Sequence, residues 1–455
     1  MTEDTTGLEL EERHSLRRVA GLSTELQDIS EVEYRQLRLE RVVLVGVWTT
    51  GTALDAENSL TELKLLAETA GSEVLDALMQ RRQKPDPATY IGSGKVEELR
   101  AAVESTGADT VICDGELAPS QLRNLEDRVK VKVVDRTALI LDIFAQHAKS
   151  KEGKAQVELA QLQYQTQRLR GWGGNLSRQA GGQAAGGEGI GSRGPGETKL
   201  ETDRRHIQTK MIKLRRELKE MATTRETKKA QRRRNEVPAV AIAGYTNAGK
   251  SSILNRLTNA GALVENALFA TLDPTTRRTE TSDGRVYTLS DTVGFVRHLP
   301  HQIIEAFRST LEEVAESDLI LHIVDGSHPD PEGQLSAVRE VFAEVKATGI
   351  AEIIVINKAD VADPVVISRL LNKEPHAVVV SARTGAGFDE LLSAIEADLP
   401  QPSAVVDVVL PYGRGDLLNQ IHTHGEIESI EHTGEGTHVV ARVSDELASV
   451  LARYA

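Results

Sequence analysis

The sequence contains very little cysteine and no long apolar segment. Its 455 residues include one cysteine, Cys113, so no disulfide bond can form within the chain. This cysteine usage fits a protein of the reducing cytosol. No apolar run approaches the roughly 18 residues that a membrane-spanning helix needs, and the acidic residues 1–6 lack the layout of a signal peptide. We therefore expect a cytoplasmic protein without a membrane span.

Basic charge is scarce overall but concentrated in one segment. The net charge is −14, whereas residues 149–235 carry 21 Lys and Arg against 9 Asp and Glu. That segment has a net charge of +12, which leaves −26 on the rest of the chain. This asymmetry is typical of an electropositive module on an acidic body, although a charged helix exposed to water would give the same counts.

The length and the pattern of apolar residues predict a multidomain α/β protein. Residues 39–148 alternate expected strands and helices, beginning with a strand at 41–48, which indicates a mostly parallel sheet. Residues 404–455 show the order strand, helix, strand, strand, helix. The expected parts are an arm at 1–38, an α/β domain at 39–148, a basic helical hairpin at 149–235, a nucleotide-binding domain with a mixed, mostly parallel sheet at 236–400 and a small α/β domain at 404–455.

Two helical stretches within the basic segment have apolar residues at alternating steps of four and three. One stripe includes Ala155, Leu159 and Leu162, and the other includes Ile207 and Met211. Such stripes predict an antiparallel hairpin packed as a coiled coil, with basic side chains facing outward. The glycine-rich loop between the helices favours contact with structured RNA, although a flexible loop is equally compatible with its composition. The candidate RNA-binding residues are Trp172, Arg178, Arg193, Arg204, Arg205, Arg215 and Arg216.

A phosphate-binding pattern, G-x-x-x-x-G-K-[ST], lies between a short apolar strand at 240–243 and an expected helix at 252–258. Its glycines let successive backbone N–H groups face a polyphosphate, its lysine reaches the β- and γ-phosphates, and its final hydroxyl can bind Mg²⁺. The helix that follows directs its N-terminal dipole at the anion. A chance match is disfavoured by the flanking strand and helix. The predicted loop consists of Gly244, Tyr245, Thr246, Asn247, Ala248, Gly249, Lys250 and Ser251.

Three further motifs follow in the order that GTPases use, each at the end of an expected strand. The carboxylate of Asp360 can accept hydrogen bonds from N1–H and the 2-amino group of guanine, which adenine lacks, so we predict GTP rather than ATP. Asn357 can brace the phosphate-binding loop, and the stem of Lys358 can lie over the purine. These strand ends share the ligand-binding edge of an open α/β sheet. The motif residues are Asp291, Thr292, Val293, Gly294, Asn357, Lys358, Ala359, Asp360, Ser381, Ala382 and Arg383.

Between the phosphate-binding loop and Asp291 runs an expected switch segment. A GTPase uses a threonine here, together with Ser251, to bind Mg²⁺ while the γ-phosphate is present. Thr271, Thr275 and Thr276 are the candidates. The nucleotide contacts predicted in this segment are Phe269, Ala270, Thr271, Leu272 and Asp273.

Taken with these motifs, the sequence resembles the HflX family of ribosome-associated GTPases, within the Obg-like group. The resemblance covers nearly the whole chain, and the stretches at 90–95 and 194–205 are more specific to that family than the nucleotide motifs. It favours Thr271 as the switch threonine, with Thr275 second. It also implies binding to the large ribosomal subunit, splitting or rescue of stalled ribosomes, and hydrolysis stimulated by the ribosome. Nothing in the sequence indicates an obligate dimer, so we expect a monomer.

The catalytic group is not assigned. Phe295 stands where Ras-type enzymes have a glutamine that orients water, which a phenyl ring cannot do, so we expect slow hydrolysis by the protein alone. Asn247 is a candidate K⁺ ligand, because related GTPases use an asparagine here, although it also suits the loop turn. Two alternatives remain open: an RNA-binding scaffold with negligible turnover, and a GTPase partner of an RNA-modifying enzyme.

Overall fold

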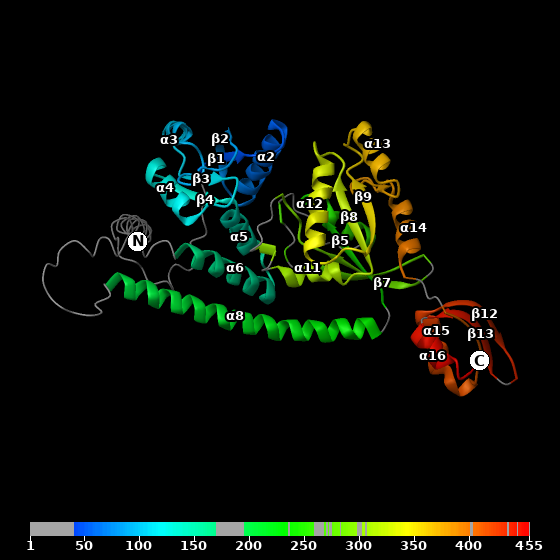
Figure 1. Cartoon of the computed structure of the whole chain (residues 1–455). Coiled ribbons are helices and arrows are strands. Elements are labelled where there is room, and N and C mark those ends of the chain that lie inside the picture. Colours follow the sequence, from blue (N-terminus) through cyan, green and yellow to red (C-terminus); the bar gives the residue numbers. More distant parts are fainter. Residues whose placement is uncertain are drawn as a thin grey trace, which may run out of the picture.

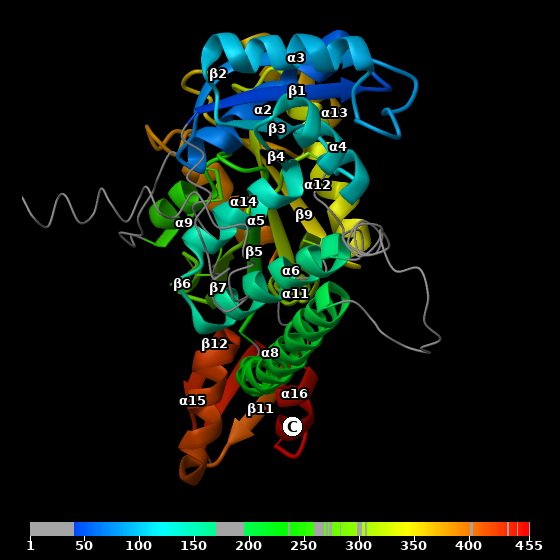
Figure 2. The same cartoon turned by 90° about the vertical axis from the view of Figure 1, so that its left-hand side faces the viewer.

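The structure is a computed structural model. It describes residues 41–169, 195–234, 237–258, 268–269, 272, 275–282, 284–297, 303–304, 307–400, 404–434, 436–443 and 445–454. Two α/β units lie side by side, a long helical hairpin runs beneath them, and a small third unit follows at the C-terminal end (Figures 1 and 2). No helix among the described residues is both long and apolar enough to cross a membrane.

The first unit is a four-stranded parallel sheet with the order β2-β1-β3-β4. Val42 and Leu44 of the central strand pack into one core while Val43 and Val45 pack into another, so both faces are buried, as parallel sheets require. The strand predicted at 41–48 is present with the same bounds, whereas the strand at 73–81 and the helix at 136–147 were not predicted. The elements are β1 (Arg41–Trp48), α2 (Ala53–Thr69), β2 (Glu73–Arg81), α3 (Ser93–Thr106), β3 (Thr110–Cys113), α4 (Pro119–Val129), β4 (Lys132–Asp135) and α5 (Arg136–His147).

The hairpin consists of α6 (Lys151–Leu169) and α8 (Pro195–Arg234). Glu158 pairs with Lys210 at 2.7 Å and Glu152 pairs with Arg225 at 2.7 Å, so the two helices run antiparallel, as predicted. The apolar stripes meet in a core of their own that includes Leu159 and Met211. The hairpin also joins the first unit, because Tyr164 and Arg168 of α6 both bind the buried carboxylate of Asp135.

The second α/β unit has a six-stranded sheet with the order β10-β9-β8-β5-β7-β6, in which β6 alone pairs antiparallel. Helices cover both faces (Figure 1). β6 corrects one expectation, since Thr275 and Thr276 were treated as part of the switch segment and instead begin this strand. The elements are β5 (Ala239–Gly244), α9 (Lys250–Thr258), β6 (Thr275–Glu280), β7 (Val286–Asp291), α11 (Arg308–Ala315), β8 (Leu319–Asp325), α12 (Pro331–Glu344), β9 (Ala351–Asn357), α13 (Pro364–Lys373), β10 (Val378–Val379) and α14 (Phe388–Asp398).

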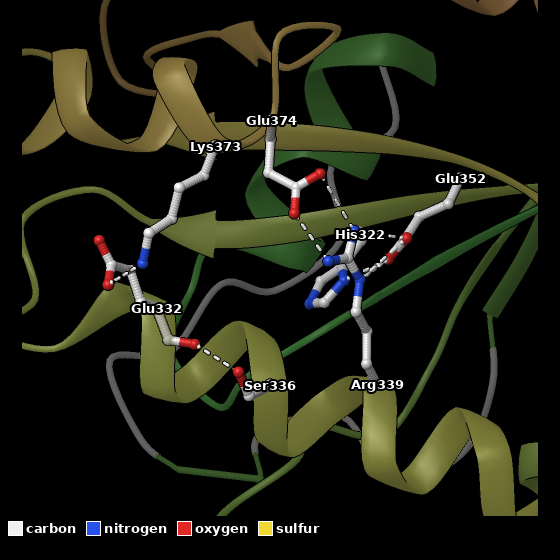
Figure 3. Close-up of polar contacts among 7 residues, drawn as sticks. All are labelled: His322, Glu332, Ser336, Arg339, Glu352, Lys373 and Glu374. Atoms are coloured by element: carbon white, nitrogen blue, oxygen red, sulfur yellow. Dashed lines mark hydrogen bonds and ion pairs between the residues drawn. The ribbon is translucent and has the colours of Figure 1, made fainter.

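A polar network between the middle of β8, the amino end of β9 and the neighbouring helices ties this sheet to those helices (Figure 3). His322 is buried on β8, and its Nδ1 lies 2.7 Å from Glu352 Oε1. Burial lowers the pKa of His322, so its neutral ring donates to that carboxylate. Arg339 of α12 then joins Glu352 to Glu374, at 2.8 and 2.7 Å. The network fixes α12 against β8 and β9, and its Glu352 lies at the amino end of β9, away from the phosphate-binding loop.

The C-terminal unit has the predicted order of elements and an antiparallel sheet in the order β11-β13-β12. Its inward-facing residues include Val406, Val408 and Leu410 of β11, which alternate with exposed positions. This is the period-2 pattern of a sheet with one buried face. The elements are β11 (Ala404–Leu410), α15 (Gly415–His424), β12 (Glu426–His432), β13 (Thr437–Val443) and α16 (Asp445–Leu451).

Candidate guanine nucleotide site

The phosphate-binding loop connects β5 to α9, the strand-to-helix context that the pattern requires. Gly244 has φ +150°, and a methyl group there would lie 2.3 Å from the carbonyl oxygen of Ile323. Gly249 has φ +96°, and a methyl group there would lie 2.2 Å from Nδ2 of Asn357. Both positions therefore require glycine, because their φ values are positive and because atoms of Ile323 and Asn357 occupy the space of a side chain.

Lys250 is buried at the start of α9, where its Nζ donates to the Tyr245 carbonyl at 2.8 Å. Burial lowers its pKa to about 8, and nearby Asp291 only partly opposes this. A buried ammonium with little opposing charge favours an anion beside it, and a bound polyphosphate would raise the pKa of Lys250 again. The site is thus electrostatically prepared for phosphate.

Two of the residues expected around Mg²⁺ lie at the start of α9 and at the end of β7. Ser251 Oγ donates to Asp291 Oδ2 at 2.6 Å, and Asp291 is buried. A hydroxyl and a carboxylate are the oxygen donors that Mg²⁺ takes, with water and phosphate oxygens completing its shell, so these residues fit the ion. No group of three or more His, Cys, Asp or Glu within the described ranges could form a separate metal site.

The three candidate switch threonines have different positions. Thr276 Oγ1 lies 2.8 Å from Ser290 Oγ, so its hydroxyl is already engaged across the β6–β7 pair. Thr275 begins β6 and lies opposite Asp291 in the strand register. Thr271, with Ala270 and Asp273, lies outside the described residues. Of the two described threonines, Thr275 is therefore the one that lies opposite the carboxylate of the expected Mg²⁺ site.

The segment after β7 closes on the phosphate-binding loop. A methyl group on Gly294 would lie 2.7 Å from Thr246 Cγ2 and 3.0 Å from Lys250 Nζ, so this glycine lies against both residues. Thr292 donates its hydroxyl to the Ile242 carbonyl, which anchors the segment to β5. Val293 is buried beside it. Phe295 is also buried, with its ring centroid 6.0 Å from that of Phe342, so it packs into the core and no polar side chain comes from this position.

The predicted base-binding residues meet at the carboxyl ends of β9 and β10. Asn357 donates from Nδ2 to the Ala248 carbonyl at 2.8 Å and accepts from the Ala382 N–H at 3.0 Å. It therefore joins the phosphate-binding loop to the loop at 381–386. Ser381 Oγ donates to Asp360 Oδ1 at 2.7 Å, and this bond holds the pKa of Asp360 below its usual value. Asp360 is thus an ionised acceptor.

The remaining predicted nucleotide contacts differ in where their side chains lie. Lys358 Nζ donates to Asp325 at 2.7 Å. Phe269 is buried, and its ring meets Phe144 of α5 edge-on, with centroids 4.6 Å apart. Asn247 is exposed with φ +58°, which agrees with a turn role. Arg383 lies 3.6 Å from Asp360, Ala359 donates its N–H to the Val380 carbonyl, and Leu272 is buried.

A contact between the two α/β units has no counterpart among the sequence motifs. Tyr245 of the phosphate-binding loop donates its hydroxyl to Glu62 of α2 and accepts the Arg297 N–H at 2.5 Å. The same N–H lies 3.2 Å from Glu62 Oε1, and Arg136 pairs with that carboxylate. The one available signal was Tyr245 itself, because a large amphipathic side chain in a glycine loop needs a partner for its hydroxyl.

Comparisons with known proteins agree with this geometry. Three family models match: "GTP-binding GTPase N-terminal" at 57–145, "GTP-binding GTPase Middle Region" at 147–232 and "50S ribosome-binding GTPase" at 239–358. The GTPase HflX of Lacrimispora saccharolytica is 46% identical over 429 residues, which cover 94% of this chain and 98% of that protein. The chain belongs to the GTPase HflX family. The GTPase HflX of Escherichia coli is 41% identical over 395 residues, covering 86% of this chain and 90% of that protein.

Membership of the HflX family means that the protein binds and hydrolyses GTP, and a GTPase domain of this kind generally uses Mg²⁺. The solved structure of the SsGBP–GDP complex covers 79% of this chain and 98% of its own, at 24% identity and a TM-score of 0.45. Among the predicted RNA-binding residues, Arg204, Arg205, Arg215 and Arg216 are exposed on α8. Trp172, Arg178 and Arg193 lie outside the described residues.

Proposed function

We propose that this HflX-family GTPase binds the large ribosomal subunit in its GTP state and splits or rescues stalled ribosomes. The observation that carries the proposal is the exposed basic surface of α8. This helix belongs to the hairpin that runs beneath the two α/β units (Figure 1) and that is joined to the first unit through Arg168 and Asp135. Ribosomal RNA presents a dense array of phosphates, which attract such a surface. The description of the family model that matches residues 239–358 names the same partner.

The basic residues of α8 are not needed to pack the hairpin. Ile207, Met211 and Leu214 face α6 and are buried. The four arginines, at 204, 205, 215 and 216, occupy the outer side of the same helix and are exposed. Because the two sets are separate, the charge of this surface can be changed without altering the apolar seam.

A route from the nucleotide to the hairpin follows from the contact between the α/β units. The Gly294 N–H is the group expected to sense the γ-phosphate, and Arg297, three residues later, binds Glu62 of α2 through its backbone N–H. On α5, which packs against α2, Phe144 packs edge-on against Phe307 as well as Phe269. A shift of the backbone at Gly294 would therefore be transmitted through these contacts to the first unit and to the hairpin joined to it. GTP would shift the equilibrium only through different affinities for the two states.

Cations would complete the site in this proposal. Mg²⁺ would take the Ser251 and Thr271 hydroxyls and, through water, Asp291, while K⁺ at Asn247 would offset phosphate charge. Since Phe295 supplies no polar group, we expect slow turnover until a ribosomal group or K⁺ completes the site. The competing function, an RNA-binding scaffold with negligible turnover, agrees with the buried Phe295 but not with GTP hydrolysis as a property of the HflX family.

The deciding assay is phosphate release with and without purified large subunits, each in K⁺ and in Na⁺ buffer. The proposal expects turnover to rise when large subunits are added. It also expects co-sedimentation with large subunits to be stronger with a non-hydrolysable GTP analogue than with GDP. No release under any condition would support the scaffold, and binding to free RNA with no response to subunits would support a partner of an RNA-modifying enzyme.

Reversing the charge of Arg204, Arg205, Arg215 and Arg216 to glutamate is expected to weaken binding to large subunits at least about tenfold at 0.1 M salt, because each basic group near RNA displaces counterions. The slope of log affinity against log salt should become shallower. The affinity for GTP should stay unchanged, because these residues lie on the outer side of the hairpin and not among the nucleotide motifs. Co-sedimentation and nucleotide titration measure the two quantities.

A matched control carries the same change in net charge elsewhere. The exposed residues Lys84, Lys130, Lys346 and Arg453 are spread over the three α/β units and can be reversed together. If this control weakens ribosome binding as much as the hairpin variant does, overall charge explains the effect. If the hairpin variant loses GTP affinity, the hairpin supports the fold of the site and the proposed role of its surface is wrong.

A further inference from the structure

Arg256 of α9 makes a set of contacts that the nucleotide motifs do not account for. Its Nη1 donates to the Ala382 carbonyl at 3.1 Å and its Nη2 donates to the Thr384 carbonyl at 3.1 Å. The guanidinium carbon also lies 5.5 Å from the ring centroid of Phe388, at the start of α14. A planar, always-charged guanidinium suits two such acceptors and a ring together.

The loop that Arg256 holds is the one that meets the base-binding residues. Ser381 Oγ donates to Asp360 at 2.7 Å and accepts the Thr384 N–H at 3.1 Å. The Ala382 N–H donates to Asn357. The position of Asp360 therefore depends on the conformation of the loop at 381–386.

The same loop leaves room for the guanidinium. Gly385 has φ +93°, and a methyl group there would lie 2.1 Å from Arg256 Nη2. A side chain at Gly385 would displace Arg256, so the glycine serves both the left-handed turn and this contact. Two independent features of the loop, the glycine and the pair of carbonyls, thus both contact the side chain of Arg256.

We propose that Arg256 is a positioning residue for guanine, which fixes the base-binding loop to the helix that begins at the phosphate-binding loop. Lys250 and Ser251 start α9, and Arg256 lies less than two turns further along it. One helix therefore holds the phosphate end of the nucleotide through its first turn and the base end through Arg256. Arg256 does not touch the reacting atoms and is not a catalytic residue.

Loss of this contact should act on nucleotide dissociation more than on folding. Arg256 is exposed, so its removal leaves both carbonyls accessible to water and creates no buried unpaired group. The loop would then sample conformations in which Ser381 no longer holds Asp360. Guanine contacts would weaken, whereas the phosphate contacts of Lys250 would remain.

The test compares Arg256→Ala and Arg256→Lys with the unmodified full-length protein, using stopped-flow dissociation of fluorescent GDP and GTP analogues. We expect dissociation about tenfold faster for Arg256→Ala, corresponding to about 1.4 kcal/mol. The lysine variant should be intermediate, since an ammonium cannot match two carbonyls and a ring at once. The affinity for inorganic tripolyphosphate, measured by competition, should stay within about twofold, because it has no base.

A matched control is Arg339→Ala in the same unit, where the arginine joins two carboxylates at the opposite sheet edge (Figure 3). It should leave dissociation rates unchanged. A double-mutant cycle adds a second check: in an Asp360→Asn background, Arg256→Ala should have little further effect on GDP dissociation. Unchanged dissociation in Arg256→Ala, an equal loss of tripolyphosphate affinity, or full additivity with Asp360→Asn would each overturn the proposal.

Discussion

Replacing Asp360 with asparagine is expected to lower the affinity for GTP by a factor of about 10²–10⁴. In the proposed site the carboxylate would accept two hydrogen bonds from guanine, and a hydrogen bond to a charged group contributes about 1.5–3 kcal/mol. Asparagine offers one acceptor and one donor, so the donor would face a guanine N–H. The preference for GTP over ATP should fall by a similar factor, because a site that binds a specific donor pair rejects ligands that lack it.

The structure explains why Asp360 is suited to this discrimination. Its side chain accepts from Ser381 at 2.7 Å, and that hydrogen bond holds the pKa of Asp360 below its usual value. The carboxylate is therefore ionised at neutral pH. A xanthine nucleotide, which has a carbonyl in place of the 2-amino group, should bind the Asp360→Asn variant better than GTP does.

Calorimetric titration with GTP, ATP and xanthosine triphosphate measures these preferences. Asp363→Asn is the matched control, since Asp363 caps α13 by accepting the Val365 N–H at 2.8 Å and asparagine caps a helix equally well. That control removes the same charge three residues away and should keep the GTP preference. An unchanged preference in Asp360→Asn would show that guanine is recognised by other residues.

The sequence was sufficient for elements whose signals are local. The apolar stripes of α6 and α8 predict the hairpin because their period matches a coiled-coil seam, and the seam is present. After Arg41 the strand at 41–48 is a continuous apolar run, typical of a strand buried on both faces, and it lies inside its sheet between β2 and β3. The hydrogen-bonded brace expected from Asn357 also follows from motif spacing.

The sequence was insufficient where tertiary contacts override local pattern. β2 is a half-buried edge strand without clean alternation, and β6, with the sequence Thr-Thr-Arg-Arg-Thr-Glu, has no apolar residue to mark it. β6 forms because its backbone pairs with β7 along six residues. Glu62 lies on α2 and Arg136 lies at the start of α5, and neither residue belongs to a recognisable sequence motif. Only the fold brings them to Tyr245.

Replacing Arg136 with methionine is expected to destabilise the first α/β unit by about 3–5 kcal/mol, the usual effect of breaking a buried ion pair. The Arg136 side chain is 2% exposed and contacts Glu62 and Asp114, each 11% exposed. Methionine fills similar space, so the main effect is electrostatic: two buried carboxylates lose their cation. Burial alone would lower the pKa of Arg136, but these two carboxylates raise it, which agrees with a charged, well-paired group.

The measurement is the first unfolding transition in urea, followed by hydrogen exchange at β1 and α5, because a chain with several units need not unfold in one step. Arg100→Met is the matched control. Arg100 pairs with Glu104 on the exposed side of α3, with both side chains about half exposed or more. An exposed pair of this kind contributes at most about 1 kcal/mol.

Two additional substitutions in the same cluster separate the effect of charge on stability from the effect of packing. Adding Glu62→Gln and Asp114→Asn to Arg136→Met removes the unpaired carboxylates and should recover much of the lost stability, since neutral amides cost less to bury than charges. The triple variant would still lack the ionised Glu62 that accepts from Tyr245 and the Arg297 backbone. If Arg136→Met unfolds no earlier than Arg100→Met, water reaches this cluster, and Glu62 cannot be the rigid link between the phosphate-binding loop and the first unit.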